Sequence, residues 1–534
     1  MSSLASIPLV GFDDRLSPLV LDGSPLSLEA IASAASGARR VTLAPEAVTR
    51  VAASRAVIER ILATGQSVYG VNTGFGKLAD LRIPADKLAQ LQTNLVRSHA
   101  CGLGDPLSER ESRAMLLLRA NVLAKGLSGV RPALVELLVA ILNHRVHPII
   151  PARGSVGASG DLAPLAHLAL VVIGEGEAVY RSQRLRGAAA LAAAGLAPLP
   201  LAAKEGLALL NGTQAMTAVG ALTLRYANRL LDAANLAGAM SLEALKGTPV
   251  AFDARIHAAR PHAGQVAAAA HLAELLQDSE IRDSHGPNTG DPRVQDAYCL
   301  RCMPQVHGAV RGVLDHAASI LVTESGSATD NPLVFPGDAD HPEAEVLSGG
   351  NFHGAPLAYA FDYAAIALTD LASISERRID RLINPDINEG LPAFLCADAG
   401  LSSGYMIAHV TAAALLNECK VLAHPSSTDS VPTSGGKEDH VSMGMTGALK
   451  LRQIVGNLEN ILAIEFLCAA QGLDFRLPLK PSAAVARAHA RIRAVVPHLE
   501  EDRSPAPDIE AVAGLISTGL LSTNPAHAAT RSLD

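Results

Sequence analysis

Three long stretches of the chain keep apolar residues at helical spacing, and they constrain the fold more than any other feature. The stretches cover residues 222–240, 356–384 and 445–470. In the first stretch, Tyr226 and Leu230 lie on one apolar stripe. The polar residues Arg225, Arg229 and Asp232 fall on the opposite face. The sequence is also rich in alanine and leucine, which favour helix. The pattern predicts a mostly α protein with long helices packed as a bundle.

The region before residue 205 is less regular than the rest. Short helical patterns alternate there with turns rich in glycine and proline around residues 70–76, 102–106 and 148–160. We expect three parts: a smaller mixed N-terminal region (1–205), a central long-helix bundle (206–505) and a C-terminal helical element (506–534). The first boundary lies in the Pro-containing stretch 196–203, and the second in the soft segment 503–510.

Composition narrows the class of protein. The 534 residues are 49% hydrophobic and 18% charged, which is typical of a globular protein with a large core. A net charge of −8 and only 3% aromatic residues argue against a nucleic-acid-binding protein. The first residues lack the pattern of a signal peptide, and the most apolar stretches, 162–174 and 187–203, are too short or too interrupted to span a membrane. Six cysteines in this length indicate free thiols in a reducing cytoplasm.

Three familiar motifs are only partly matched. Gly157–Asp161 resembles a nucleophile elbow but has aspartate where the last glycine is required. Gly74–Lys77 resembles the end of a phosphate-binding loop, but the earlier glycine and the final hydroxyl residue are missing. Cys299 and Cys302 form a C-x-x-C pair without a second pair at zinc spacing, so we expect two core cysteines and no metal site.

The most informative segment is Arg153–Ala163, which holds three glycines in seven residues. Composition alone indicates a turn before a helix, with Ser159 or Asp161 as the helix cap. Chemistry offers an alternative, because the amide nitrogen of Gly160 is unhindered and can attack the carbonyl carbon of Ala158 in a compressed backbone. Loss of water from the ring and from the Ser159 side chain then leaves an electrophilic methylidene group. The surrounding fold must hold the strain that this reaction needs.

The segment Gly154–Leu170 resembles the characteristic motif of the aromatic amino acid ammonia-lyases and aminomutases. Further motifs of that family match, in family order, at Tyr69–Gly76, Asn211–Gln214, Gln295–Arg301, Gly350–His353 and Glu438–Met443. The resemblance implies an aspartase/fumarase-like multihelical architecture. It also implies that Ala158, Ser159 and Gly160 cyclise autocatalytically to the cofactor 4-methylidene-imidazol-5-one (MIO).

The resemblance also implies roles for individual residues. Tyr69 is expected to remove the β-proton of the substrate, which requires an environment that stabilises its phenolate. Arg301 has a bidentate guanidinium, which suits a carboxylate, and is expected to bind the carboxylate of the substrate. The alternative role for this arginine is a surface salt bridge. Tyr298, one helical turn earlier, would support the cofactor or a proton step. Asn211, by itself a helix cap, would bond the cofactor or the substrate. The matched motifs add Gln295 and Phe352 to the substrate-binding residues.

The residues expected to contact the substrate side chain favour histidine. His99 follows Ser98, a pair similar to that of histidine-using members, although some tyrosine-using members share it. Glu438 begins a Glu-Asp-His sequence typical of histidine enzymes, and its carboxylate can accept a hydrogen bond from an imidazole N–H. A phenyl ring would leave that carboxylate buried and unpaired, at a cost of about 1–3 kcal/mol. The preceding residues Gly435–Lys437 depart from the pattern of histidine-using members. As a consequence, Lys437 could pair with Glu438, and the two glycines could loosen the loop.

The sequence therefore predicts a carbon–nitrogen lyase that converts L-histidine to trans-urocanate and ammonia. A tyrosine or phenylalanine ammonia-lyase and an aromatic aminomutase are the alternatives within the family. A non-catalytic protein that kept the fold is the alternative outside it. The resemblance implies a homotetramer whose active sites are shared between subunits. Glu465 lies on the apolar stripe of the third long stretch, so it must be an ion pair inside the core or part of the site.

Overall fold

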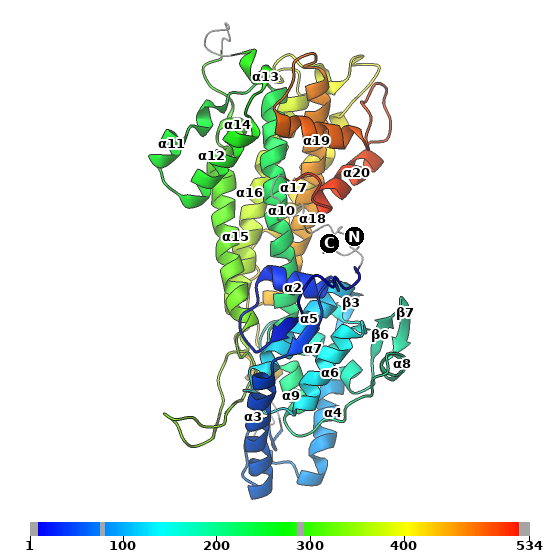
Figure 1. Cartoon of the computed structure of the whole chain (residues 1–534), viewed down its shortest axis with the longest axis vertical. Coiled ribbons are helices and arrows are strands. Elements are labelled where there is room, and N and C mark those ends of the chain that lie inside the picture. The colour runs from blue at the N-terminus through cyan, green and yellow to red at the C-terminus, as the bar shows by residue number, and fades with distance from the viewer. Residues whose placement is uncertain (1–8, 75–80, 286–292, 523–534) are drawn as a thin grey trace.

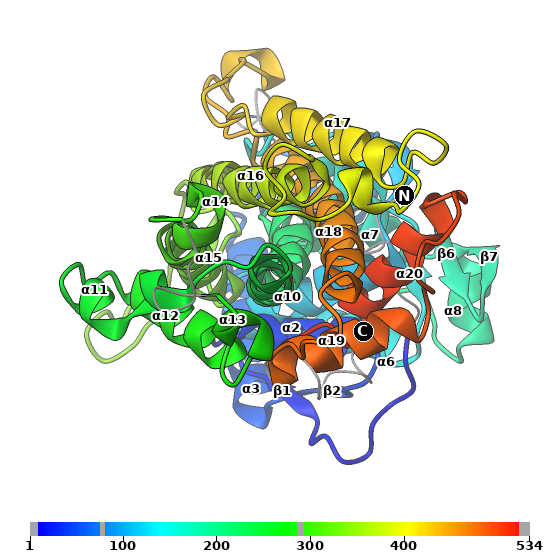
Figure 2. The same cartoon turned by 90° about the horizontal axis from the view of Figure 1, so that it is seen from above.

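The computed structural model describes residues 9–74, 81–285 and 293–522. Long helices parallel to the long axis dominate it (Figure 1). Five of them form the bundle: α10 (Gln214–Ala244), α15 (Met303–Ser325), α16 (Ala355–Ile383), α17 (Met406–Leu422) and α18 (Gly444–Asp474). Seen from above, α10 and α18 occupy the middle of the bundle, and α17 lies on its outside (Figure 2). The predicted mostly α architecture is confirmed.

The N-terminal region mixes helices with short strands. Its helices are α2 (Leu28–Ala35), α3 (Pro45–Thr64), α4 (Leu88–His99), α5 (Glu109–Ala124), α6 (Pro132–Asn143), α7 (Leu162–Val172), α8 (Gly187–Ala193) and α9 (Glu205–Leu210). Strand β1 (Leu19–Leu21) pairs in parallel with β2 (Val41–Leu43), and β3 (Leu103–Pro106) pairs antiparallel with β5 (Pro151–Arg153). Strands β4 (His147–Pro148), β6 (Glu177–Tyr180) and β7 (Gln183–Arg186) form an antiparallel sheet. The turns expected around 102–106 and 148–160 are replaced in part by short strands, β3, β4 and β5, whereas residues 154–160 contain no strand.

Smaller helices lie around the upper half of the bundle in Figure 1. They are α11 (Ala254–Ala258), α12 (Ala263–Leu275), α13 (Glu280–Asp283), α14 (Tyr298–Arg301), α19 (Ala483–Arg493) and α20 (Ala506–Ser517). Strands β8 (Leu333–Phe335) and β9 (Glu345–Leu347) form an antiparallel hairpin. Short 3-10 helices are η2 (Ala85–Lys87), η3 (Pro249–Phe252), η4 (Ala393–Leu395) and η5 (Ser434–Gly436). One hydrophobic core includes residues from Leu19 to Leu521, and the division at 205 and 505 remains a prediction.

The three predicted long helices are present, and α10 extends the predicted stretch by eight residues at its start and four at its end. The polar face of α10 differs from the simplest amphipathic pattern, because Arg229 and Asp232 are buried. The C-terminal segment covers this face: Arg229 donates a hydrogen bond to the carbonyl of Ser517, and Ser522 donates one to Asp232. The polar side chains of α10 therefore join it to the end of the chain.

Two helices, α16 and α18, are long and apolar enough to cross a membrane by length and composition alone. In their most apolar windows, 72% and 83% of the residues are buried inside the protein, which is the pattern of core helices. The stretches that are most apolar in the sequence, 162–174 and 187–203, lie elsewhere. They form the short helices α7 and α8.

Glu465 forms an ion pair inside the core, one of the two roles that its position allowed. Arg378 on α16 donates two hydrogen bonds to it, at 2.6 and 2.9 Å, and the hydroxyls of Ser241 and Ser375 donate two more. Glu465 and Arg378 are fully buried. This buried ion pair, in which both Glu465 oxygens accept hydrogen bonds, joins α16 to α18.

Candidate active site

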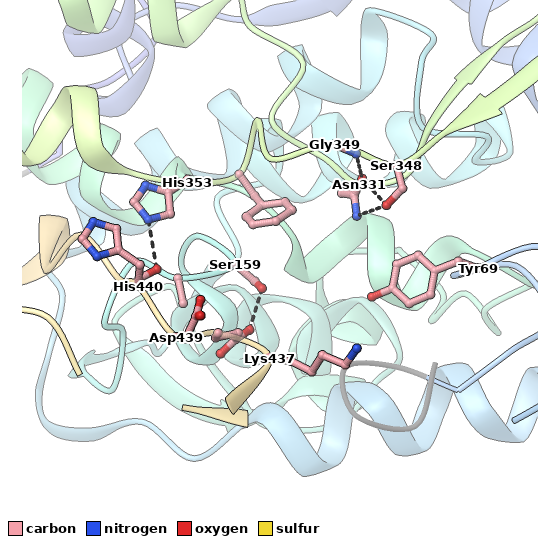
Figure 3. Close-up of a pocket in the computed structure, with 12 residues that line it drawn as sticks. Tyr69, Ser159, Asn331, Ser348, Gly349, His353, Lys437, Asp439 and His440 are labelled. Atoms are coloured by element: carbon pink, nitrogen blue, oxygen red, sulfur yellow. Dashed lines mark hydrogen bonds between the residues drawn. The ribbon is translucent and has the colours of Figure 1, made fainter. Parts of the chain in front are cut away.

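A cavity of about 370 Å³ lies where the N-terminal region meets the bundle. Loops carry all of its lining residues: Tyr69, Ala158, Ser159, Asn331, Ser348, Gly349, Phe352, His353, Lys437, Glu438, Asp439 and His440. Figure 3 shows Tyr69 at one side of the cavity and His353 with His440 at the other, with Ser159 between them. Five residues expected from the sequence thus meet here: Tyr69, Ala158, Ser159, Phe352 and Glu438.

The Ala158-Ser159-Gly160 triad is held in a tight backbone at the start of α7. Gly160 has a φ of +72°, and an added Cβ would meet the carbonyl oxygen of Gly212 at 2.1 Å. The next amide, of Asp161, donates a hydrogen bond to the same oxygen at 2.7 Å. Only glycine fits at position 160. The simple helix cap is not what forms, because Asp161 makes no capping hydrogen bond and Ser159 points to another partner.

Asp161 anchors the triad to the bundle instead. Its buried carboxylate accepts hydrogen bonds from the Ser155 hydroxyl at 2.8 Å and from the Met216 amide on α10 at 2.8 Å. Burial raises the pKa of Asp161 to about 6, although these two hydrogen bonds lower it. The carboxylate therefore fixes the strained loop against the long helix that begins beside it.

Asn211 lies beneath the cavity, between α9 and α10, rather than at its surface. Its side-chain amide donates to the carbonyl of Asn331 at 3.0 Å, and Asn331 lines the cavity. The buried guanidinium of Arg119 donates two hydrogen bonds to the Asn211 carbonyl, at 2.7 and 2.9 Å. The Oδ1 atom of Asn211 is buried and has no hydrogen-bond partner among the residues that the structure describes. Within this part of the chain, the Oδ1 atom of Asn211 is therefore an unused hydrogen-bond acceptor, next in sequence to Gly212, which contacts the triad. An asparagine that caps a helix would use this oxygen for the cap.

Glu438 is fixed by three hydroxyl groups. Ser159 donates to its Oε1 at 2.6 Å, and Thr433 and Ser434 donate to its Oε2 at 2.7 and 2.8 Å. Burial alone would raise the pKa of Glu438, but these hydrogen bonds outweigh burial, so its pKa lies below the ordinary value. Lys437 is not one of its partners in the described part of the chain. In place of the pairing that the sequence suggested, three hydroxyl groups bind the carboxylate.

His99, the last residue of α4, lies near this carboxylate and helps to lower the pKa of Glu438. Its Nδ1 atom bonds to the carbonyl of Leu95 at 2.9 Å, which leaves the other ring nitrogen for a different partner. Phe75 and Gly76, the end of the expected Tyr69 loop motif, and Lys77 lie outside the described residues.

Gln295, Tyr298 and Arg301 are not brought to the cavity of this chain. Tyr298 and Arg301 form α14, in the upper part of Figure 1, whereas the triad precedes α7 in the lower part. The Arg301 guanidinium lies over the Tyr298 ring, 4.6 Å from its centroid. Within the described ranges Arg301 forms no ion pair, and its buried Nε has no hydrogen-bond partner. The described residues therefore offer no surface salt bridge that would explain this arginine.

The cavity also contains residues that the sequence argument did not assign. Asn331, Ser348 and Gly349 flank the β8–β9 hairpin, where the Asn331 side-chain oxygen accepts the Gly349 amide at 2.7 Å. His353 and His440 stack with ring centroids 5.8 Å apart, and His353 bonds to the His440 carbonyl. Both histidines belong to matched motifs, which was the available signal. Asn331 stands in a polar turn before an apolar strand, a pattern too common to indicate a site.

The family model described as aromatic amino acid lyase matches residues 26–494. The chain belongs to the aromatic amino acid lyase family. A histidine ammonia-lyase from Anaeromyxobacter sp. (strain K) is 56% identical over 94% of this chain and 99% of that protein. The crystal structure of histidine ammonia-lyase from Trypanosoma cruzi covers 97% of this chain and 95% of its own, with a TM-score of 0.86 and 42% identity. The tyrosine aminomutase structure from Streptomyces globisporus covers 95% and 98%, with a TM-score of 0.89 and 40% identity.

Membership of the aromatic amino acid lyase family makes this chain an ammonia-lyase enzyme. The family depends in general on MIO, and the triad of this chain suits its formation. The Gly160 backbone is held by Gly212 where a Cβ would not fit, and the Ser159 hydroxyl has a carboxylate beside it. Gly160 carries the amide nitrogen that would close the ring, and Ser159 carries the hydroxyl that would leave as water.

Proposed function

We propose that this enzyme deaminates L-histidine to trans-urocanate and ammonia. The observation that carries the proposal is Glu438, a carboxylate of lowered pKa whose Oε1 lies 2.6 Å from the Ser159 hydroxyl in the cavity. An imidazole N–H can donate to Oε1 of this carboxylate, whereas a phenyl ring offers it no donor. The relatives named histidine ammonia-lyase support the same substrate.

The proposed cofactor is MIO formed from Ala158, Ser159 and Gly160. It would supply an electrophile for the substrate amine, which makes ammonia a better leaving group. Residues around the triad would remove the proton and bind the substrate. Tyr69 lines the cavity and would take the β-proton, and Phe352 lines it and would pack against the substrate. Asn211, with a buried oxygen that has no partner, would bond the cofactor or the substrate from below.

The carboxylate of the substrate needs a cation, and we propose that Arg301 of a second subunit supplies it. Arg301 has no ion pair among the described residues and lies at a distance from its own cavity, together with Tyr298 and Gln295. The site is then complete only in an assembly, which we propose to be a homotetramer.

The outer face of the bundle supports an assembly. Large apolar side chains project from it at helical spacing on α16 (Tyr359, Tyr363 and Ile366) and on α17 (Ile407 and Val410), each about half exposed or more. Exposed apolar stripes of this kind mark protein–protein contacts. We place the enzyme in the reducing cytoplasm, in keeping with its six free cysteines.

The second candidate is an aromatic aminomutase, favoured by the similarity to the tyrosine aminomutase structure. The experiment that separates the candidates offers L-histidine, L-tyrosine and L-phenylalanine separately to the purified enzyme and identifies each product by mass. We expect urocanate from histidine alone. Coumarate, cinnamate or a β-amino acid as the main product would overturn the histidine proposal and leave the family assignment intact.

A further inference from the structure

The Ser159 hydroxyl is the group that maturation of the triad must remove, and it already has a defined partner. Its Oγ donates to Oε1 of Glu438 at 2.6 Å, across 279 residues of sequence. The other carboxylate oxygen, Oε2, is held by Thr433 and Ser434. Oε1 is therefore aimed at Ser159 by contacts that do not involve the triad itself.

We propose that Glu438 catalyses the dehydration of Ser159 that completes the cofactor, in addition to its role toward substrate. This inference rests on the MIO part of the proposed function. In the first stage, the Gly160 nitrogen bonds to the Ala158 carbonyl carbon. The carbonyl oxygen leaves as water with the hydrogens of the Gly160 and Ser159 amides, and a C=N bond forms between Ala158 and Ser159.

In the second stage, Glu438 takes the Cα proton of Ser159, which the new ring has made acidic. The electron pair of the Cα–H bond forms the Cα=Cβ double bond, and the Cβ–Oγ bond breaks. Glu438 returns the same proton to the departing oxygen, which leaves as water. The carboxylate starts and ends ionised, and the two stages together release two water molecules without an oxidant. One carboxylate can serve both atoms because Cα is only two bonds from Oγ.

Other ionisable groups near the triad are less suited to this step. The Asp161 carboxylate is occupied by the Ser155 hydroxyl and the Met216 amide. Lys437, Asp439, His353 and His440 line the same cavity, but the hydrogen bond that the structure gives to the Ser159 hydroxyl goes to Glu438. The hydrogen bonds from Thr433 and Ser434 also keep this carboxylate ionised, as a proton acceptor must be.

Under this proposal Glu438 acts first in the dehydration of Ser159 and afterwards in substrate binding. Before maturation Oε1 accepts the Ser159 hydroxyl, and after maturation that donor is gone. An imidazole N–H can then take its place. The same step that creates the electrophile therefore leaves Oε1 with an accepting position for the substrate.

The test is the intact mass of the chain and of the peptide that contains residues 153–163, followed after synthesis in a cell-free system. Wild-type protein is expected to become lighter by two water molecules. Glu438→Gln keeps the size and an accepting oxygen but cannot carry the proton. We expect it to lose the Ser159 hydroxyl about 10²-fold more slowly or worse, a typical effect of removing an acid–base group. Ser159→Ala has no hydroxyl to lose, so it gives the reference mass of a chain that can lose at most the first water.

The matched control is Lys437→Gln, the neighbouring side chain in the same loop and cavity, which should mature at the wild-type rate. Far-UV circular dichroism shows that each variant is folded. Full and rapid water loss in Glu438→Gln would overturn this inference while leaving the proposed function standing. Equal retardation in both variants would also overturn it, because the loop and not the carboxylate would then be responsible. A wild-type chain that loses no water would overturn the cofactor proposal itself.

Discussion

At the scale of single residues, the site depends on which positions lack a side chain and which carry a proton acceptor. Gly160 packs so closely on Gly212 that no Cβ fits there. Tyr69 and Glu438 reach the same cavity from loops far apart in sequence. The sequence motifs predicted all these residues. They did not predict Asn331 or the occupied oxygens of Glu438, because those contacts are set by tertiary packing.

Tyr69→Phe tests the proton acceptor for the substrate. The change removes one oxygen and keeps the ring, so we expect the cavity to keep its shape and KM for histidine to change little. We expect kcat to fall by about 10²–10⁴-fold, the usual contribution of a general base. Steady-state urocanate formation measures both constants. Tyr180→Phe, on β6 and outside the cavity, is the control and should behave as wild type. A Tyr69→Phe enzyme with wild-type kcat would assign the proton transfer to another group.

At the scale of elements, the long helices were predictable and their polar contacts were not. Apolar periodicity identified α10, α16 and α18 because it depends on local sequence. The same periodicity cannot say that Arg229 and Asp232 are buried, since the C-terminal segment that covers them lies nearly 300 residues away. It likewise left two roles open for Glu465, whose partner Arg378 is on another helix. Short strands such as β3 and β5 were missed because each has only a few residues and needs its partner to form.

Glu465→Ala tests the ion pair between α16 and α18. It leaves the fully buried Arg378 charge without its partner, which costs about 3–5 kcal/mol of unfolding free energy in typical cases. Urea denaturation at fixed protein concentration measures the change. The control is Glu418→Ala on the exposed face of α17, expected to change stability by less than about 0.5 kcal/mol. Unchanged stability with lost turnover in Glu465→Ala would instead place Glu465 in the site.

At the scale of the whole molecule, the groups needed for one reaction are divided between two places. The triad, Tyr69 and Glu438 surround the cavity, and Tyr298 with Arg301 lies on α14 in the opposite part of the chain. The proposed assembly would bring these groups together without refolding the bundle. The exposed apolar stripes on α16 and α17 provide a surface through which copies can associate.

Mixing two inactive variants tests this division directly. Tyr69→Phe and Arg301→Ala should each be nearly inactive alone, because each spoils every site. If the two residues of one site come from different subunits, mixed assemblies contain sites with an intact Tyr69 and an intact Arg301. Random one-to-one mixing should then restore about a quarter of wild-type activity, since each of the two residues is intact with a chance of one half. The measurement is urocanate formation after joint expression of the two chains, with each variant expressed alone as the control. Activity no higher than that of the variants alone would show that one chain supplies both residues, and α14 would then have to move toward its own cavity.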